Sequence, residues 1–162
     1  MKSAHCLRFV WPLLLVALAC GGGFAAVPAE TGPARSVGGP APTLVSVVSR
    51  KQHGVSGSFD LPVDFAVAVA GPVAIEPRAA GAGHTLVFQF DSIVNNTGSP
   101  GVFDDAGSVI AGASATLLPG NQAVAVTLPP VPNRSRVRVT LNNVGGTGLN
   151  VSAAIGFLLG DV

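Results

Sequence analysis

The chain has 162 residues, enough for one domain with appendages. Hydrophobic residues make up 48% of it and charged residues only 10%, which excludes a conventional disordered protein and also a coiled coil or helical bundle. The formal net charge of +1 gives no electrostatic basis for binding nucleic acid, so no nucleic-acid partner is expected.

The N-terminus has the pattern of a secretory signal peptide. Lys2 and Arg8 precede an apolar run over residues 9–19. This run is too short to span a bilayer, because a transmembrane helix needs about 20 residues. Small residues follow the run, which predicts cleavage after Ala25 and a signal peptide over residues 1–25. We therefore expect an exported protein, secreted, periplasmic or at the cell surface, with no transmembrane span in the mature chain.

A second route of export stays open beside the first. Residues 17–20 read Ala-Leu-Ala-Cys, which resembles a bacterial lipobox and would leave Cys20 lipidated. Cys6 is the other cysteine, and both precede the expected domain, which therefore has no disulfide or thiol chemistry. Residues 26–42 are rich in Gly, Pro and Ala without a regular period, which predicts a flexible tether.

Residues 43–162 alternate between apolar and other side chains with a period of two, the pattern of half-buried β-strands. Clusters of Gly, Pro and Asn separate the runs, and residues 106–116 fit a bulged strand about as well as a loop. The fold predicted is all-β, an antiparallel β-sandwich, Ig-like or jelly-roll-like, with eight or nine strands. The clearest runs are 55–61, 65–69, 86–90, 124–128, 137–141 and 151–159.

Phenylalanine side chains are expected to supply the bulk of a core that is otherwise rich in Ala and Gly. The run 151–159 is apolar on nearly both faces near its end, so it should be a central, well-paired strand. The residues expected inside are Phe59, Phe65, Phe88, Phe90 and Phe157.

Two histidines of the predicted domain are candidates for a metal or acid-base site. His53 and His84 would act with Asp60, Asp64 and Glu76. The spacings match no ligand motif, and no two histidines stand at i, i+2 or i, i+4. Each histidine adjoins a glycine, so we favour solvated positions at strand ends over a functional role.

Two further sets of charged residues are candidate ligand sites. Asp104 and Asp105 follow one another in a predicted loop and offer oxygen ligands for calcium, although a solvated turn is the favoured interpretation. Arg134, Arg136 and Arg138 are predicted on one face of one strand, where they could hold an acidic glycan or a phosphate. The favoured interpretation is an outward strand face, where charge also prevents aggregation between sheet edges.

No catalytic motif stands out in the predicted domain. The chain lacks a Gly-x-Ser-x-Gly elbow with a base placed for it, a P-loop and a Gly-x-Gly-x-x-Gly turn between strand and helix. We therefore expect neither an enzyme nor a cofactor. The chain has no Tyr and its one Trp is in the leader, so the aromatic platform of many sugar-binding sandwiches is also missing.

Three segments of the predicted domain resemble a known module. It is a β-sandwich at the C-terminal end of large secreted bacterial proteins, directly before a dockerin-like calcium-binding repeat. The resemblance covers about residues 45–161. It rests on VSRKQHG at 48–54 with GSFDLP at 57–62, on IEPR at 75–78 with HTLVF at 84–88, and on VSAAIGFLLGD at 151–161.

The resemblance implies an accessory module of exported proteins, to which no catalytic residues belong. Pro77 stands where the family has a cysteine, and the sequence stops at Val162, where the family's calcium loop would begin. Because Gly160 and Asp161 alone offer too few oxygens, we expect no calcium dependence and no pairing with a cohesin.

The expected function is that of a non-catalytic exported β-sandwich accessory module, acting in attachment or display at the cell surface or in the extracellular space. Its partner would be a glycan or another extracellular protein. The alternative is a carbohydrate-binding module. A third candidate, a hydrolase built on a sandwich, would require a cleft with paired carboxylates.

Overall fold

Nine β-strands carry nearly all the regular structure in the residues that the computed structural model describes, 40–78 and 83–158. These residues belong to one unit of the chain, residues 37–162. The predicted number of strands is confirmed. The elements are β1 (Leu44–Gln52), the short 3-10 helix η1 (Gly54–Ser56), β2 (Ser58–Val63), β3 (Ala74–Glu76), β4 (Thr85–Phe90), β5 (Ser99–Asp104), β6 (Ser114–Leu117), β7 (Ala123–Thr127), β8 (Ser135–Val144) and β9 (Leu149–Phe157).

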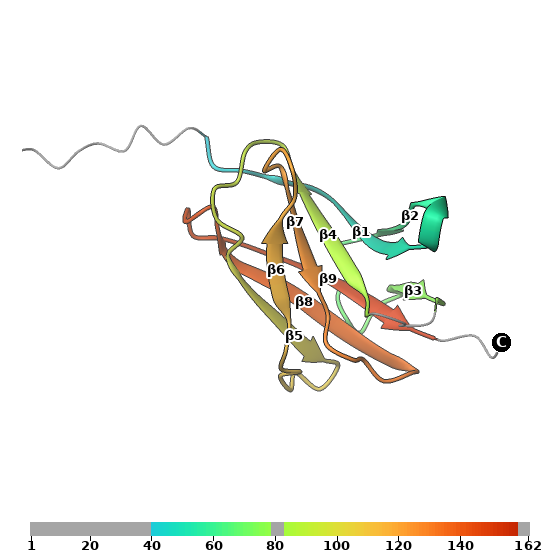
Figure 1. The fold of residues 1–162 in the computed structure, drawn as a ribbon. Coiled ribbons are helices and arrows are strands. Elements are labelled where there is room, and N and C mark those ends of the chain that lie inside the picture. Colours follow the sequence, from blue (N-terminus) through green and yellow to red (C-terminus); the bar gives the residue numbers. More distant parts are fainter. Residues whose placement is uncertain (1–39, 79–82, 159–162) are drawn as a thin grey trace, which may run out of the picture. The chain divides into compact units, whose positions relative to one another are not determined.

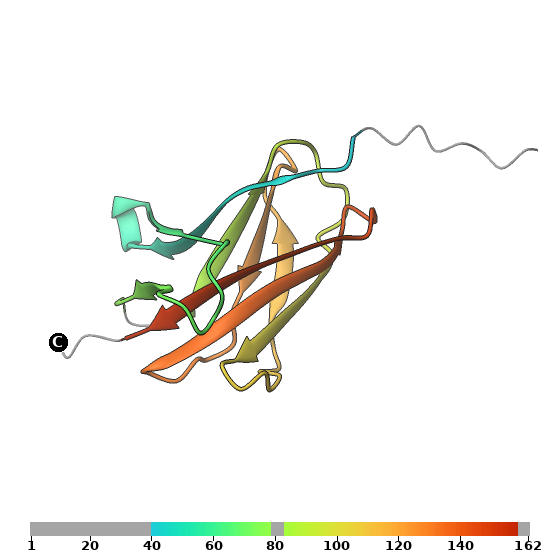
Figure 2. The same cartoon turned by 180° about the vertical axis from the view of Figure 1, so that it is seen from behind.

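The strands form two sheets that pack face to face (Figures 1 and 2). The five-stranded sheet has the order β2-β1-β4-β7-β6, and the four-stranded sheet has the order β3-β9-β8-β5. Neighbouring strands are antiparallel, except that β3 runs parallel to β9. Between the hairpins β1–β2, β6–β7 and β8–β9, the chain repeatedly crosses from one sheet to the other. The predicted β-sandwich is confirmed, with this parallel pair added.

The core consists of the alternate side chains that the two sheets direct toward each other. Burying one face of each sheet against the other is what the period-two pattern requires, because successive side chains of a strand point to opposite faces. Branched aliphatic residues dominate the core, and its aromatic residues are Phe88, Phe90 and Phe157, as predicted. The five-stranded sheet contributes Val47, Leu86, Phe88, Val124 and Val126, and the four-stranded sheet contributes Val102, Val137, Val139, Leu141, Ile155 and Phe157.

Strand β9 lies inside its sheet, as predicted from its apolar character on both faces. It pairs with β8 on one side and with β3 on the other. The side chain of Phe157 at its end is only 2% exposed and packs against the ring of His84, with ring centroids 4.5 Å apart. The prediction that Phe157 is a core residue is confirmed.

One predicted strand is wrong, and the predicted run 55–61 is a strand only from Ser58, because η1 occupies its start. Residues 65–69 lie in a pair of turns within the connection from β2 to β3. The carboxylate of Asp64 accepts the backbone N–H of Ala66 at 2.9 Å, and the N–H of Gly71 bonds to the carbonyl of Ala68 at 2.8 Å. These local bonds close turns in place of a ladder with a neighbouring strand. The alternation was misleading, because alanine between the larger residues gives no polar face.

Two of the five expected core phenylalanines are also wrong. The side chain of Phe59 is 52% exposed and that of Phe65 is 39% exposed. Phe59 lies on the edge strand β2, opposite a part of the sandwich where the facing sheet offers only the three-residue β3. Phe65 lies in the turns after β2. Both positions therefore lack the second layer that a buried ring needs.

Several sequence predictions concern segments other than residues 40–78 and 83–158. The signal peptide over 1–25, lipidation of Cys20, most of the tether over 26–42 and the terminal Gly160 and Asp161 lie outside the described residues. Within the described residues, no helix is long and apolar enough to cross a membrane.

Candidate functional site

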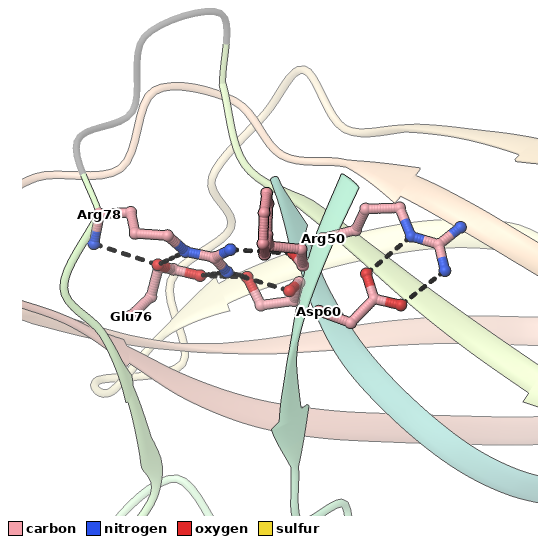
Figure 3. A network of polar contacts seen from close by, with 6 residues as sticks. Arg50, Asp60, Glu76 and Arg78 are labelled. Atoms are coloured by element: carbon pink, nitrogen blue, oxygen red, sulfur yellow. Dashed lines mark hydrogen bonds and ion pairs between the residues drawn. The ribbon is translucent and has the colours of Figure 1, made fainter. Parts of the chain in front are cut away.

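Three polar side chains meet between the two sheets, near the ends of β1 and β3 (Figure 3). Glu76, the last residue of β3, has a fully buried side chain at 0% exposure, and Ser49 of β1 is also buried. The guanidinium of Arg78 forms a bidentate ion pair with the carboxylate of Glu76: Nε donates to Oε1 at 2.6 Å and Nη2 donates to Oε2 at 2.6 Å. The hydroxyl of Ser49 donates to Oε2 as well. We call these three residues the Glu76 network.

Arg78 also binds the backbone of the opposite sheet. Its Nη1 donates to the carbonyl of Phe59 in β2 at 2.9 Å, and its Nη2 donates to the carbonyl of Ser49 in β1 at 3.0 Å. The backbone N–H of Arg78 also donates to Oε1 of Glu76, at 3.1 Å. The Glu76 network therefore joins β3 of the four-stranded sheet to β1 and β2 of the five-stranded sheet.

The ionisation of the Glu76 network is fixed by these contacts. Burial alone raises the pKa of Glu76, but the hydrogen bonds from Arg78 and Ser49 outweigh it and hold that pKa below its ordinary value. The same contact with Glu76 raises the pKa of Arg78. At neutral pH the pair is a carboxylate and a guanidinium, with both carboxylate oxygens occupied.

The two candidate histidines differ in their surroundings. His84 precedes β4 and is buried beside Phe157. Burial lowers the pKa of His84; the charge of Glu76 acts in the opposite direction, and the charges of Lys51 and Arg78 lower it further. His53 is exposed between β1 and η1, where its ring meets the ring of Phe59 edge-on at 5.2 Å. The predicted solvated position is confirmed for His53 and wrong for His84.

Asp60 forms a second ion pair, on the outer side of the same strands. Its carboxylate binds Arg50 with both oxygens, at 2.8 Å to Nε and 2.7 Å to Nη2. Arg50 and Asp60 lie directly opposite each other in β1 and β2, next to the residues of the Glu76 network, but their side chains point the other way (Figure 3). The contact with Arg50 lowers the pKa of Asp60.

The candidate acid-base set does not assemble into one site. Glu76 and His84 are buried near one end of the sandwich, Asp60 is paired on the outer face, and Asp64 closes a turn. Within the described residues, no group of three or more His, Cys, Asp or Glu side chains is arranged to hold a metal ion.

The loop after β5 uses one of its two adjacent carboxylates in its own turn. Oδ1 of Asp104 accepts the N–H of Ser108 at 2.7 Å, and Asp105 is exposed beside it. The side chain of Asp104 therefore stabilises the turn of its own loop, and a turn is the interpretation that the sequence favoured over calcium binding.

The arginine set is divided between a strand and the turn before it. Arg136 and Arg138 are exposed on the outer face of β8, as predicted. Arg134 precedes β8 and has a φ of 60°, which places it in the turn. The prediction of one strand face for all three is therefore wrong for Arg134. The guanidinium of Arg138 lies over the ring of Phe103 in β5, 5.2 Å from its centroid.

Two shallow grooves share lining residues from β9, one on the outer face of β8 and β9 and the other at the edge of the sandwich, where β9 approaches the start of β1. One, of about 190 Å³, is lined by Arg138, Thr140 and Asn142 of β8 and by Asn150 and Ser152 of β9. The second, of about 400 Å³, continues from Asn150 and Ser152 toward the start of β1 and is bordered by the aromatic ring of Phe65. The polar side chains of the first groove form a row along each strand, because alternate residues of a strand point to the same face.

Sequence reasoning noted Glu76 but missed the Glu76 network itself. Glu76 and Arg78 stand two residues apart in an extended segment, which places their side chains on the same side. That spacing was a usable signal for the pair. Ser49 gave no such signal, because its contact with Glu76 joins residues 27 positions apart in the chain.

The fold defines a β-sandwich domain with a buried ion pair between its sheets. Searches of protein-family models, of curated proteins and of solved structures found no match for this chain.

Proposed function

We propose that this chain is a non-catalytic, exported β-sandwich accessory module that serves attachment or display at the cell surface or in the extracellular space. The observation that carries the proposal is that the carboxylate of the Glu76 network is fully engaged by other groups of the protein. Its carboxylate is fully buried and accepts hydrogen bonds at both oxygens, so neither oxygen is available to take a proton from a substrate. Among the described residues, the cluster whose side chains are best suited to acid-base catalysis therefore serves to join the two sheets.

The resemblance to modules that precede dockerin-like repeats supports the same proposal. Ser49, Glu76 and Arg78 all fall in the segments that carry this resemblance, and so does His84. These segments converge around the end of β9. Their shared polar residues are explained by a structural role in the sandwich. Export follows from the leader, and the mass of the mature protein distinguishes cleavage after Ala25 from lipidation of Cys20.

An activity screen with matched variants tests the proposal. The purified protein should convert glycans, esters and peptides no faster than a heat-denatured sample does. Turnover by the native protein that disappears in Glu76→Gln or His84→Asn, with both variants still folded, would overturn the non-catalytic role. Arg50→Gln, on the outer face of the other sheet, is the control for an unspecific loss of charge.

A further inference from the structure

The outer face of β8 presents a line of side chains suited to a polar polymer. Alternate residues of a strand recur about every 6–7 Å on one face. Here that row runs from two guanidinium groups, Arg136 and Arg138, to the hydroxyl of Thr140 and the amide of Asn142. Asn150 of β9 adds a second amide, whose oxygen is fixed because it accepts the backbone N–H of Asn143 at 3.0 Å.

The arginines of this face are not neutralised by the domain itself. Within residues 40–78 and 83–158, no carboxylate lies within ion-pair distance of Arg136 or Arg138, whereas Arg50 and Arg78 each have one. Unpaired guanidinium groups on one face attract an anion, and their fork geometry matches a carboxylate.

Contacts within the domain restrain both of these arginines. The contact with the ring of Phe103 restrains the guanidinium of Arg138. Nη1 of Arg136 donates to the carbonyl of Gly71 at 3.3 Å, in the segment between β2 and β3 that crosses over β9 in Figure 2. A restrained side chain loses less entropy when it binds a ligand, which favours a preformed site.

The second groove adds an aromatic surface to the charged row. Phe65 borders it and is 39% exposed, with Leu149 and Val151 nearby. Both grooves are lined by Asn150 and Ser152 and therefore adjoin, so together they offer a cationic, hydrogen-bonding half and an apolar half. A sugar ring combines hydroxyl groups with an apolar face, so a chain of acidic sugars complements both halves.

We propose that the outer face of β8 and the adjoining edge of β9 bind an acidic polysaccharide whose carboxylate is held by Arg138 and whose sugar ring packs on Phe65. This inference rests on the proposed attachment role and names its partner. Thr140, Asn142 and Asn150 contribute hydrogen bonds to hydroxyl groups along the chain. Charge complementarity selects the acidic polymer, and the ring of Phe65 favours a polymer of sugars over an acidic polymer without rings.

Titration of the full chain with polygalacturonate tests the site. Methyl-esterified polygalacturonate is the matched ligand, since it keeps the sugar backbone and removes the charge. We expect affinity for the acid to exceed that for the ester by about tenfold or more. Arg138→Gln should lose a similar factor, Arg138→Lys should lose less, and Phe65→Ala should lose roughly fivefold.

Two controls separate a built site from general attraction between charges. Arg50→Gln removes the same formal charge from the opposite sheet and should change affinity by less than about twofold. Polyglutamate, a carboxylate polymer without sugar rings, should bind at least about tenfold more weakly than polygalacturonate. Thermal melts confirm that each variant is folded.

Several results would overturn the proposal: equal binding of acid and ester, equal losses in Arg50→Gln and Arg138→Gln, polyglutamate bound as tightly as polygalacturonate, or no binding at millimolar sugar. Reducing ends are assayed in the same mixtures. Their release would contradict the non-catalytic role and leave the site standing. A lack of both binding and release would remove the site and leave the non-catalytic role.

Discussion

Glu76 and Asp60 make the same bidentate contact with an arginine in two different surroundings. Glu76 is fully buried between the sheets, whereas the side chains of Arg50 and Asp60 are each about one-third exposed. Water screens the exposed pair, and the flexibility of its side chains offsets part of the attraction. The carboxylate of Glu76 has lost that water, although the side chain of Arg78 is still 21% exposed, so the charge of Glu76 depends on the presence of its protein partners.

Glu76→Gln should therefore lower the free energy of unfolding by about 3 kcal/mol, measured by urea denaturation. The substitution removes the negative charge and places an N–H₂ donor against a donor of Arg78 or Ser49. Asp60→Asn, the matched change in the exposed pair, should cost less than about 1 kcal/mol. Equal losses in the two variants would show that the Glu76 network contributes no more than a surface pair.

At the scale of the strand, position in the sheet decides how much a large side chain contributes. Phe157 ends β9, which is flanked by strands on both sides and faced by the other sheet. Phe59 lies on the edge strand β2 and is half exposed. The two residues are chemically identical, so they report directly on the number of layers around them.

Phe157→Ala should cost about 3–5 kcal/mol of unfolding free energy, because it leaves a cavity beside His84 and removes buried apolar area. Phe59→Ala should cost less than about 1 kcal/mol by the same measurement. A loss below about 1 kcal/mol for Phe157→Ala would place its ring at the surface and contradict the assignment of β9.

At the scale of the whole molecule, three ionisable groups whose pKa values are lowered by folding make the protein less stable as the pH falls. The pKa of His84 is lowered in the folded protein, so below about pH 6.5 the unfolded chain takes up a proton that the folded chain does not. The carboxyl groups of Glu76 and Asp60 also have lowered pKa values. Their contribution is complete above their unfolded pKa values, near pH 4, and is lost as the pH falls through the folded ones.

The free energy of unfolding should therefore fall in two stages on acidification, first below about pH 6.5 and again below about pH 4.5. His84→Asn should abolish the first stage and retain the second. His53→Asn, which removes an exposed histidine, should keep both. Urea denaturation at a series of pH values measures the slopes, and a first stage that survives His84→Asn would contradict its assignment to that residue.

The sequence by itself predicted the class of fold, because burial of one strand face leaves a period-two pattern wherever a strand is covered by a second layer. It therefore located β4, β7, β8 and β9 and placed Phe88 and Phe157 in the core. It failed at residues 65–69, where local turns use the same residue types. It did not indicate β3, whose three residues are too few to show a period.

The candidate sites depended on tertiary structure, because their members are far apart in the chain. Ser49 and Arg78 are separated by 29 positions and meet only because the chain crosses between sheets after β2. Likewise, the connection between β2 and β3 brings Phe65 beside the polar row of β8 and β9. Alternation within a strand records which face is buried. Which strands become neighbours, and which side chains then meet, is decided by the packing of the two sheets.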